Sequence, residues 1–172
     1  MWRRIFIILS VILFALLQCS VFPMIYLIST TTNLLLGLTI SFAIMWGQRT
    51  GMFAGALCGL VLDLFNGTGL GVYVLIYVLF GYVGGWMNKT FFPEDIKLPL
   101  ASIAIGDLLY GLCIYFVFFL LQGDFQFMHY LISVILPETI FTVVVMLVLY
   151  PIILKIHGKI LESEKRNAKK FI

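Results

Sequence analysis

The sequence predicts an all-α fold held in a membrane, and three observations support this prediction: composition, hydropathy and the placement of charge. Apolar residues make up 62% of the 172 residues and charged residues only 11%, whereas soluble domains use roughly 45–50% and 25%. The mean hydropathy is +1.11, and the apolar stretches approach the ~20 residues that a spanning helix needs. We therefore expect a single transmembrane domain over residues 1–172, with no water-soluble domain.

Six transmembrane helices are expected, each bounded by charged residues, proline or glycine clusters. Their approximate ranges are 5–22, 30–47, 51–65, 70–87, 98–121 and 130–154, followed by a basic cytoplasmic tail over 155–172. The first helix ends before Pro23, and the turn NGTG at residues 66–69 separates the short third helix from the fourth. This turn predicts that the third and fourth helices pack antiparallel.

Prolines mark the starts of the last two predicted helices. Pro99 lies in the first turn of the fifth helix, where a missing N–H costs little. Pro137 lies one to two turns into the sixth helix. It should kink that helix unless neighbouring groups satisfy the carbonyl that it leaves unpaired.

The placement of basic residues sets the orientation. With six spans, all 11 lysines and arginines fall on one side of the membrane. They are Arg3, Arg4, Arg49, Lys89, Lys97, Lys155, Lys159, Lys165, Arg166, Lys169 and Lys170. The positive-inside rule then places both termini in the cytoplasm. We expect the basic tail to anchor the topology and attract anionic lipid; docking of cytoplasmic partners there stays open, and nucleic-acid binding is not expected.

The sequence predicts no catalytic, cofactor or metal site. Cys19, Cys58 and Cys113 lie in predicted helices without C-x-x-C spacing, so they are expected to pack as small apolar side chains. His129 and His157 are expected at opposite faces of the membrane, which excludes a two-His metal site and a His-Cys-Asp constellation. No phosphate-binding or dinucleotide-binding glycine pattern is present. We therefore expect a protein that is not an enzyme.

Three acidic residues, Asp63, Asp107 and Glu138, are predicted near one level in the middle of the membrane. No lysine, arginine or histidine is expected at that level, so desolvation and repulsion both disfavour three charged carboxylates. Three interpretations stay open. In the first, the acids hold helices together as neutral or hydrogen-bonded groups. In the second, at least one of them receives a polar or basic group from a partner's transmembrane helix. In the third, they form an ion or proton pathway.

A ladder of glycines with four-residue spacing precedes the first of these acids. It consists of Gly51, Gly55 and Gly59. Four residues turn a helix by about 400°, so Asp63 shares nearly one face with Gly59 and should point into a tight helix–helix seam. Gly81 and Gly85 in the fourth helix offer a counter-surface, whereas Leu62 is expected to face lipid.

The segment GMFAGALCGLVLDLFNGTGLGVYVLIYVLFGYVGG, residues 51–85, resembles the central signature of the MreD family of bacterial rod shape-determining membrane proteins. The flanking pieces LQCSVFP, NLLLGLTISFAIMWG, FFPEDIKLPL, GDLLYGL and ILPETIFT resemble corresponding segments of that family, so the resemblance covers nearly the whole chain. One departure is Thr32, where the family pattern suggests proline.

The resemblance implies a non-enzymatic scaffold in the bacterial cytoplasmic membrane that helps to maintain cell shape and organises peptidoglycan synthesis. It implies an MreC-like bitopic partner, together with a RodA-type glycosyltransferase, a class B penicillin-binding transpeptidase and an MreB-like filament. The six-helix body of the family is also similar to the substrate-binding subunits of energy-coupling-factor transporters. The alternative is therefore a small-solute, vitamin-like binding subunit of a transporter, although the predicted outer loops offer few polar residues for a pocket.

The resemblance and the ladder together select residues for helix packing or partner contact, without individual roles. These are Gly51, Gly55, Gly59, Asp63, Gly71, Tyr77, Gly81, Gly85, Asp107, Pro137 and Glu138.

Overall fold

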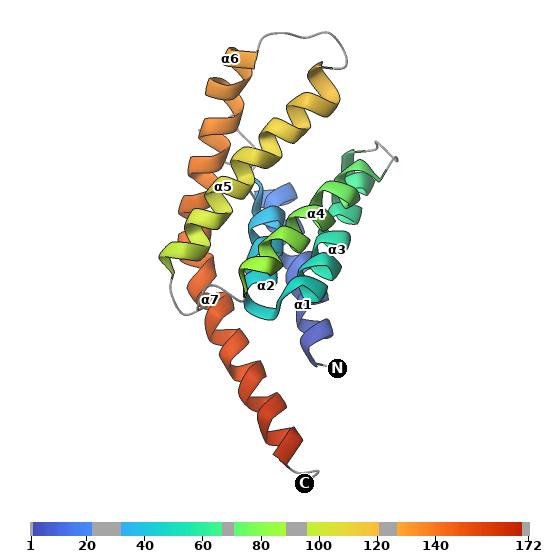
Figure 1. The fold of residues 1–172 in the computed structure, drawn as a ribbon, viewed down its shortest axis with the longest axis vertical. Helices are drawn as coiled ribbons and strands as arrows, with labels where there is room; N and C mark the ends of the chain where they lie inside the picture. Colours follow the sequence, from blue (N-terminus) through green and yellow to red (C-terminus); the bar gives the residue numbers. More distant parts are fainter. Residues whose placement is uncertain (1, 22–31, 67–70, 89–95, 121–126, 170–172) are drawn as a thin grey trace.

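The computed structural model describes residues 2–21, 32–66, 71–88, 96–120 and 127–169, which are almost entirely helical (Figure 1). No strand occurs among these residues, and the predicted all-α fold is confirmed. Two helical stretches, Lys97–Val117 and Phe127–Ser163, are long and apolar enough to cross a membrane. Leu34–Trp46 and Val72–Met87 are shorter apolar helices, so the count of six spans stays a prediction.

The described residues form six continuous helical segments, in the order of the six predicted stretches. They are α1 (Trp2–Leu16) with the π-helical turn η1 (Leu17–Val21), α2 (Leu34–Trp46), α3 (Gln48–Asn66), α4 (Val72–Met87), α5 (Lys97–Ile114) with η3 (Tyr115–Leu120), and α6 (Phe127–Tyr130) with η4 (Leu131–Ile135) and α7 (Leu136–Lys169).

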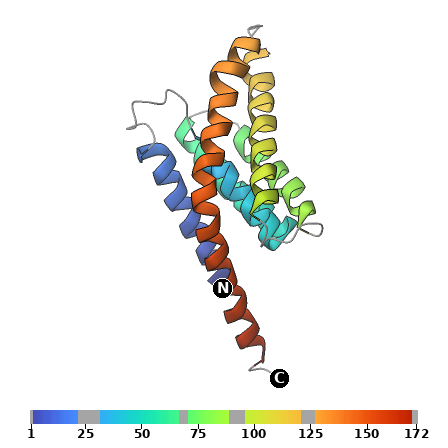
Figure 2. The ribbon, with the colours of Figure 1, turned by 90° about the vertical axis from the view of Figure 1, so that its left-hand side faces the viewer.

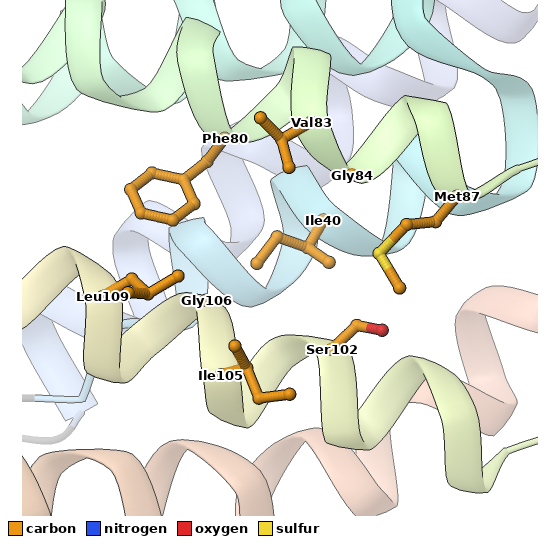
Figure 3. A pocket seen from close by; sticks show the side chains of 9 residues that line it. All are labelled: Ile40, Phe80, Val83, Gly84, Met87, Ser102, Ile105, Gly106 and Leu109. Atoms are coloured by element: carbon orange, nitrogen blue, oxygen red, sulfur yellow. The ribbon is translucent and has the colours of Figure 1, made fainter.

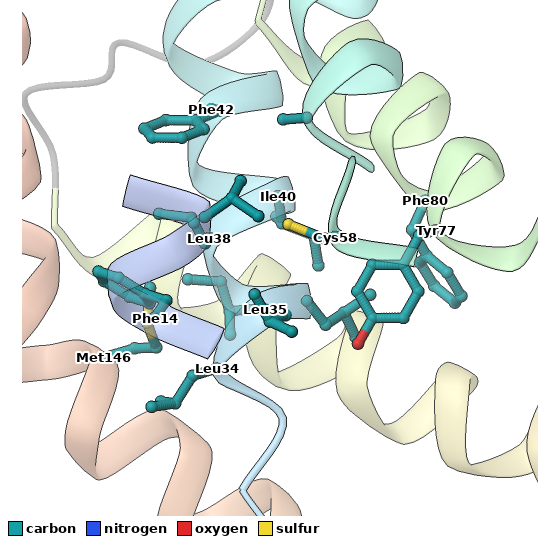
Figure 4. Close-up of a cluster of buried hydrophobic side chains, with 14 of the residues drawn as sticks. Phe14, Leu34, Leu35, Leu38, Ile40, Phe42, Cys58, Tyr77, Phe80 and Met146 are labelled. Atoms are coloured by element: carbon teal, nitrogen blue, oxygen red, sulfur yellow. The ribbon is translucent and has the colours of Figure 1, made fainter. Parts of the chain in front are cut away.

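Helix α2 is the centre of the body. Every residue from Leu34 to Met45 is buried, because this helix is apolar on all sides and can be surrounded by others. It contacts α1, α3, α4, α5 and α7. Figure 4 shows α2 side chains in the core with Phe14 of α1 and Met146 of α7, and with Cys58 of α3 and Tyr77 of α4.

A single glycine joins α2 to α3. Helix α2 ends at Trp46 and α3 begins at Gln48, with Gly47 between them at φ 83°. This left-handed conformation favours glycine, and the Gly47 N–H donates to the Ala43 carbonyl at 2.8 Å. Helix α3 thus begins three residues before the predicted position 51.

The last helix carries the basic tail. Helix α7 continues to Lys169, so the predicted tail, which starts at residue 155, is helical as far as Lys169. This part of α7 projects beyond the other helices (Figures 1 and 2). Pro137 is the second residue of α7 and lies two residues after Ile135, the last residue of the π-helical turn η4. The distortion expected at this proline therefore takes the form of a local change of helix type, which is a common response to an interrupted hydrogen-bond ladder.

Candidate functional site

The seam between α3 and α4 is a contact of backbone against backbone. A Cβ atom added at Gly51 would lie 2.5 Å from the Gly81 carbonyl oxygen, and one at Gly59 would lie 2.5 Å from Val74 Cα. A Cβ at Gly55 would meet the carbonyl group of Tyr77. Since real Cβ atoms do not approach other atoms so closely, only glycine fits at these positions.

Helix α4 contributes glycines to the same seam. A Cβ at Gly81 would meet the Gly51 carbonyl, and one at Gly85 would meet Gln48 Cα. The two glycine rows therefore face each other along antiparallel helices, and α3 with α4 forms the most extensive helix–helix contact in the described part of the chain. Such close approach increases van der Waals contact, which is a principal source of helix association in lipid.

Asp63 caps the N-terminus of α4 from the end of α3. The backbone N–H groups of Tyr73 and Val74 donate to Asp63 Oδ1 and Oδ2 at 3.4 and 3.1 Å. Helix α4 has no side-chain cap of its own, because its N-cap residue is Gly71 at φ 69°. The carboxyl group thus meets backbone donors that a helix terminus leaves unpaired, in the region where the helix dipole favours negative charge.

Gln18 caps the N-terminus of α2 in a similar way. Its Oε1 accepts a hydrogen bond of 3.1 Å from the Leu35 N–H, while the N-cap residue Asn33 makes no side-chain capping bond. The N–H of Asn33 instead donates to Thr142 Oγ1 at 3.1 Å, which ties the start of α2 to α7. Two helix N-termini at the same end of the body are therefore capped by residues from other helical segments.

Asn33 is also the centre of a buried polar group. The Tyr77 hydroxyl, on a fully buried side chain, donates to Asn33 Oδ1. The Tyr77 ring packs edge-on against Tyr110 of α5, with ring centroids 5.6 Å apart. These contacts join α2, α4 and α5 through polar side chains.

Asp107 lies in this group without a hydrogen-bond partner. Its side chain is 2% exposed, and neither carboxyl oxygen has a partner within hydrogen-bond geometry. Asn33, Thr139 and Thr142 surround the carboxyl group closely enough to interact with it, but Asn33 Nδ2 is also unpartnered. Thr139 donates to the Ile135 carbonyl at 2.9 Å within its own helix. Unpaired buried polar atoms are rare and indicate strain, an unseen partner or a function.

Glu138 lies beside Asp107, close enough for the two carboxyl groups to interact electrostatically. It is half-buried and lines a cavity of about 220 Å³. The lining residues are Gln18, Asn33, Leu62, Tyr73, Tyr110, Gly111, Ile114, Tyr130, Val134 and Glu138. We call this space the polar cavity.

The predicted site residues fall into two places rather than one. Asp63 and five of the glycines, Gly51, Gly55, Gly59, Gly81 and Gly85, form the α3–α4 seam, whereas Glu138 lines the polar cavity and Asp107 lies beside Glu138. Nothing lies within 4 Å of a Cβ added at Gly71. Neither Asp63 nor Asp107 is a lining residue of that cavity, whereas Tyr73, whose N–H donates to Asp63, is one. Tyr77 connects the two places, because its carbonyl faces Gly55 while its hydroxyl reaches Asn33.

The expectation that Leu62 faces lipid is wrong. Leu62 is 7% exposed and lines the polar cavity. Cys58, one turn earlier on α3, is fully buried. Helix α3 buries this second face in addition to its glycine face, because it also packs on α1 and α2.

Sequence reasoning missed five polar members of the cavity lining: Gln18, Asn33, Tyr73, Tyr110 and Tyr130. The available signal was the presence of single amides in strongly apolar stretches, where a polar side chain needs a partner. Among the residues that the structure describes, no group of three or more His, Cys, Asp or Glu is arranged to hold a metal ion.

A second, apolar hollow lies between α4 and α5. Figure 3 shows its first part, between Phe80, Val83 and Met87 of α4 and Ser102, Ile105 and Leu109 of α5. The volume of this part is about 120 Å³. A neighbouring hollow of about 390 Å³ shares Leu109 and includes Leu79, Leu112 and Cys113. We call the two together the α4–α5 groove.

Replacing Tyr77 by phenylalanine should destabilise the protein by about 1–3 kcal/mol, because Asn33 Oδ1 would lose its donor in a buried site. Tyr82→Phe is the matched control, since that side chain is 51% exposed, and it should change stability by less than about 0.5 kcal/mol. Unfolding in detergent, followed by circular dichroism, measures both variants. Equal stability of the two would show that the hydroxyl contact contributes nothing.

The fold, the α3–α4 seam and the polar cavity define a class: a small all-helical protein with two helices apolar enough to cross a membrane and with polar groups buried between closely packed helices. The family model of the rod shape-determining protein MreD matches residues 2–160. The chain belongs to the MreD family, as the resemblance indicated. No curated protein and no solved structure matches the chain.

Membership places the chain among bacterial membrane proteins of rod shape determination. The family is associated with the rod-shape machinery.

Proposed function

We propose that the protein is a non-enzymatic scaffold of the cell-elongation machinery, which holds an MreC-like bitopic protein in the cytoplasmic membrane. The match to the MreD family over residues 2–160 carries this proposal. The RodA-type glycosyltransferase, the class B transpeptidase and the MreB-like filament are further partners in it. Both termini lie in the cytoplasm, where the basic C-terminal part of α7 meets anionic lipid.

The proposed contact for the partner's spanning helix is the α4–α5 groove. Its lining is apolar apart from Ser102, whose hydroxyl donates to the Leu98 carbonyl in the same helix. A hollow between helices leaves lining atoms without packing partners, and side chains of a further helix would restore those contacts. An uncharged spanning helix fits this lining.

Native cysteines test the contact. Cys113 is exposed in the groove, Cys19 is exposed elsewhere on the chain, and Cys58 is buried. With the MreC-like protein of the same cell carrying one cysteine at successive positions of its spanning helix, oxidation should form a disulfide with Cys113. Cys19→Ala should leave the cross-link unchanged and Cys113→Ala should abolish it. Cross-linking through Cys19 alone would place the partner elsewhere.

The scaffold role itself is tested in cells. Depletion of the protein should convert rods into rounded cells, and re-expression should restore the rods. Rods that persist after complete depletion would contradict the proposal.

The alternative function is a small-solute binding subunit of a transporter, and the polar cavity is the observation that favours it. Against it, about 220 Å³ is less than the roughly 300–1,000 Å³ of most small-molecule sites. A vitamin-sized solute would require a larger space. The scaffold therefore remains the better-supported proposal.

A further inference from the structure

The lining of the polar cavity includes an acidic side chain but no basic one. Six of its ten lining residues carry polar side chains: Gln18, Asn33, Tyr73, Tyr110, Tyr130 and Glu138. Glu138 is the charged one, and no lysine, arginine or histidine lines the space. Next to it, Asp107 is 2% exposed with both carboxyl oxygens unpartnered. The region thus offers two carboxyl groups and no cation from the described part of the chain.

Two carboxyl groups side by side without a counter-charge are costly. A buried carboxylate loses its hydration, and the neutral side chains of Asn33, Thr139 and Thr142 near Asp107 supply no opposite charge. A cation placed between the helices would supply the missing partner. The tyrosine rings of the lining add to this preference, because aromatic faces attract cations within about 6 Å of the ring centroid.

The size of the cavity limits the ligand. About 220 Å³ is the volume of roughly seven water molecules at about 30 Å³ each. This is enough for an ammonium group with a short carbon chain. The amide oxygens of Gln18 and Asn33 each already accept one hydrogen bond, from the Leu35 N–H and the Tyr77 hydroxyl, and Glu138 is the acceptor in the lining that can carry a negative charge.

We propose that the polar cavity binds a primary ammonium group, with Glu138 as its charge partner and Asp107 as the neighbouring negative group. The ammonium group comes either from the headgroup of an aminophospholipid or from a small soluble amine. This inference does not depend on the scaffold function.

The experiment uses the full-length protein in nanodiscs, and its two arms separate the two sources. In the lipid arm, retention of phosphatidylethanolamine is compared with that of phosphatidylcholine by native mass spectrometry, since the methylated headgroup has no N–H donors. In the soluble arm, ethanolamine is titrated against the protein in phosphatidylglycerol nanodiscs by calorimetry. We expect selective binding in at least one arm.

Two variants test the site. Glu138→Gln keeps the shape of the side chain and should weaken ammonium binding at least ~10-fold, the equivalent of about 1.4 kcal/mol. Val134→Phe fills the cavity while leaving Glu138 in place, and should weaken binding similarly. Glu162→Gln is the matched control, because that side chain is 72% exposed on α7, and it should bind like the wild type. Circular dichroism confirms that each variant is folded.

The proposal is overturned by any of three results. One is the absence of selective binding from both sources. Another is wild-type affinity in folded Glu138→Gln. The last is wild-type affinity in Val134→Phe, which would place the ammonium group outside the cavity even if Glu138→Gln does not fold.

Discussion

Gly55→Ala should cost about 3 kcal/mol of stability, or more, although it adds only a methyl group. The new Cβ would lie 2.8 Å from the Tyr77 carbonyl carbon and 3.1 Å from the Val78 nitrogen. These are backbone atoms, which cannot rotate away as a side chain would, so α3 and α4 must separate. Overpacking of a close-packed core usually costs 1–3 kcal/mol. The cost should be at the upper end because the neighbouring glycine contacts are loosened as well.

Gly158→Ala is the matched control for this substitution. Gly158 is exposed on α7, and nothing lies within 4 Å of an added Cβ. Alanine is a better helix former than glycine, so this variant should be neutral or up to ~1 kcal/mol more stable. Unfolding of both variants by increasing SDS in mixed micelles, followed by circular dichroism, gives the comparison. Equal midpoints would mean that the α3–α4 seam does not require glycine.

Asp63→Ala should cost about 2–4 kcal/mol. The substitution removes both acceptors of the Tyr73 and Val74 N–H groups, and each donor left unpaired in a buried site costs about 1–3 kcal/mol. Loss of an exposed N-cap costs less, about 0.5–2 kcal/mol, because water replaces the cap. Asp63 is 8% exposed, so replacement by water is restricted.

The conservative variant separates hydrogen bonding from charge. Asp63→Asn keeps one acceptor oxygen and loses the interaction of a negative charge with the α4 N-terminus, which is worth about 0.3–2 kcal/mol. It should therefore be more stable than Asp63→Ala and less stable than the wild type. Leu64→Ala is the control, since its side chain is 74% exposed on the same helix. SDS unfolding curves followed by circular dichroism rank the wild type and the three variants. If Asp63→Ala were as stable as Leu64→Ala, Asp63 would not contribute to the seam.

Much of the helical organisation could be predicted because the composition and the residue spacing of each segment can be read without knowing its neighbours. The apolar stretches gave six helical segments in the expected order, and the four-residue spacing placed Gly51, Gly55 and Gly59 on one face of α3. Some helices extend beyond the predicted spans. Helix α3 begins at Gln48 because Gly47 permits a turn of one residue, and α7 runs on to Lys169 beyond its apolar part.

The partners of the buried polar groups were less predictable. Depth along each helix suggested that Asp63, Asp107 and Glu138 share one level. In the structure Asp63 meets the N-terminus of α4, whereas Glu138 lines the polar cavity and Asp107 lies beside it. Depth is only one coordinate. The rotation of each helix and its distance from the others also decide which side chains meet.

By itself, the sequence determined the all-helical membrane class, the MreD family and the face of α3 that carries glycine. The tertiary structure alone decided that Asp63 caps a neighbouring helix, that Leu62 turns inward, and that Gln18 and Asn33 join Glu138 around one cavity. The physical reason is that periodicity describes one helix at a time. Contacts between helices depend on crossing angles and axial offsets, and the close packing of the whole body sets both.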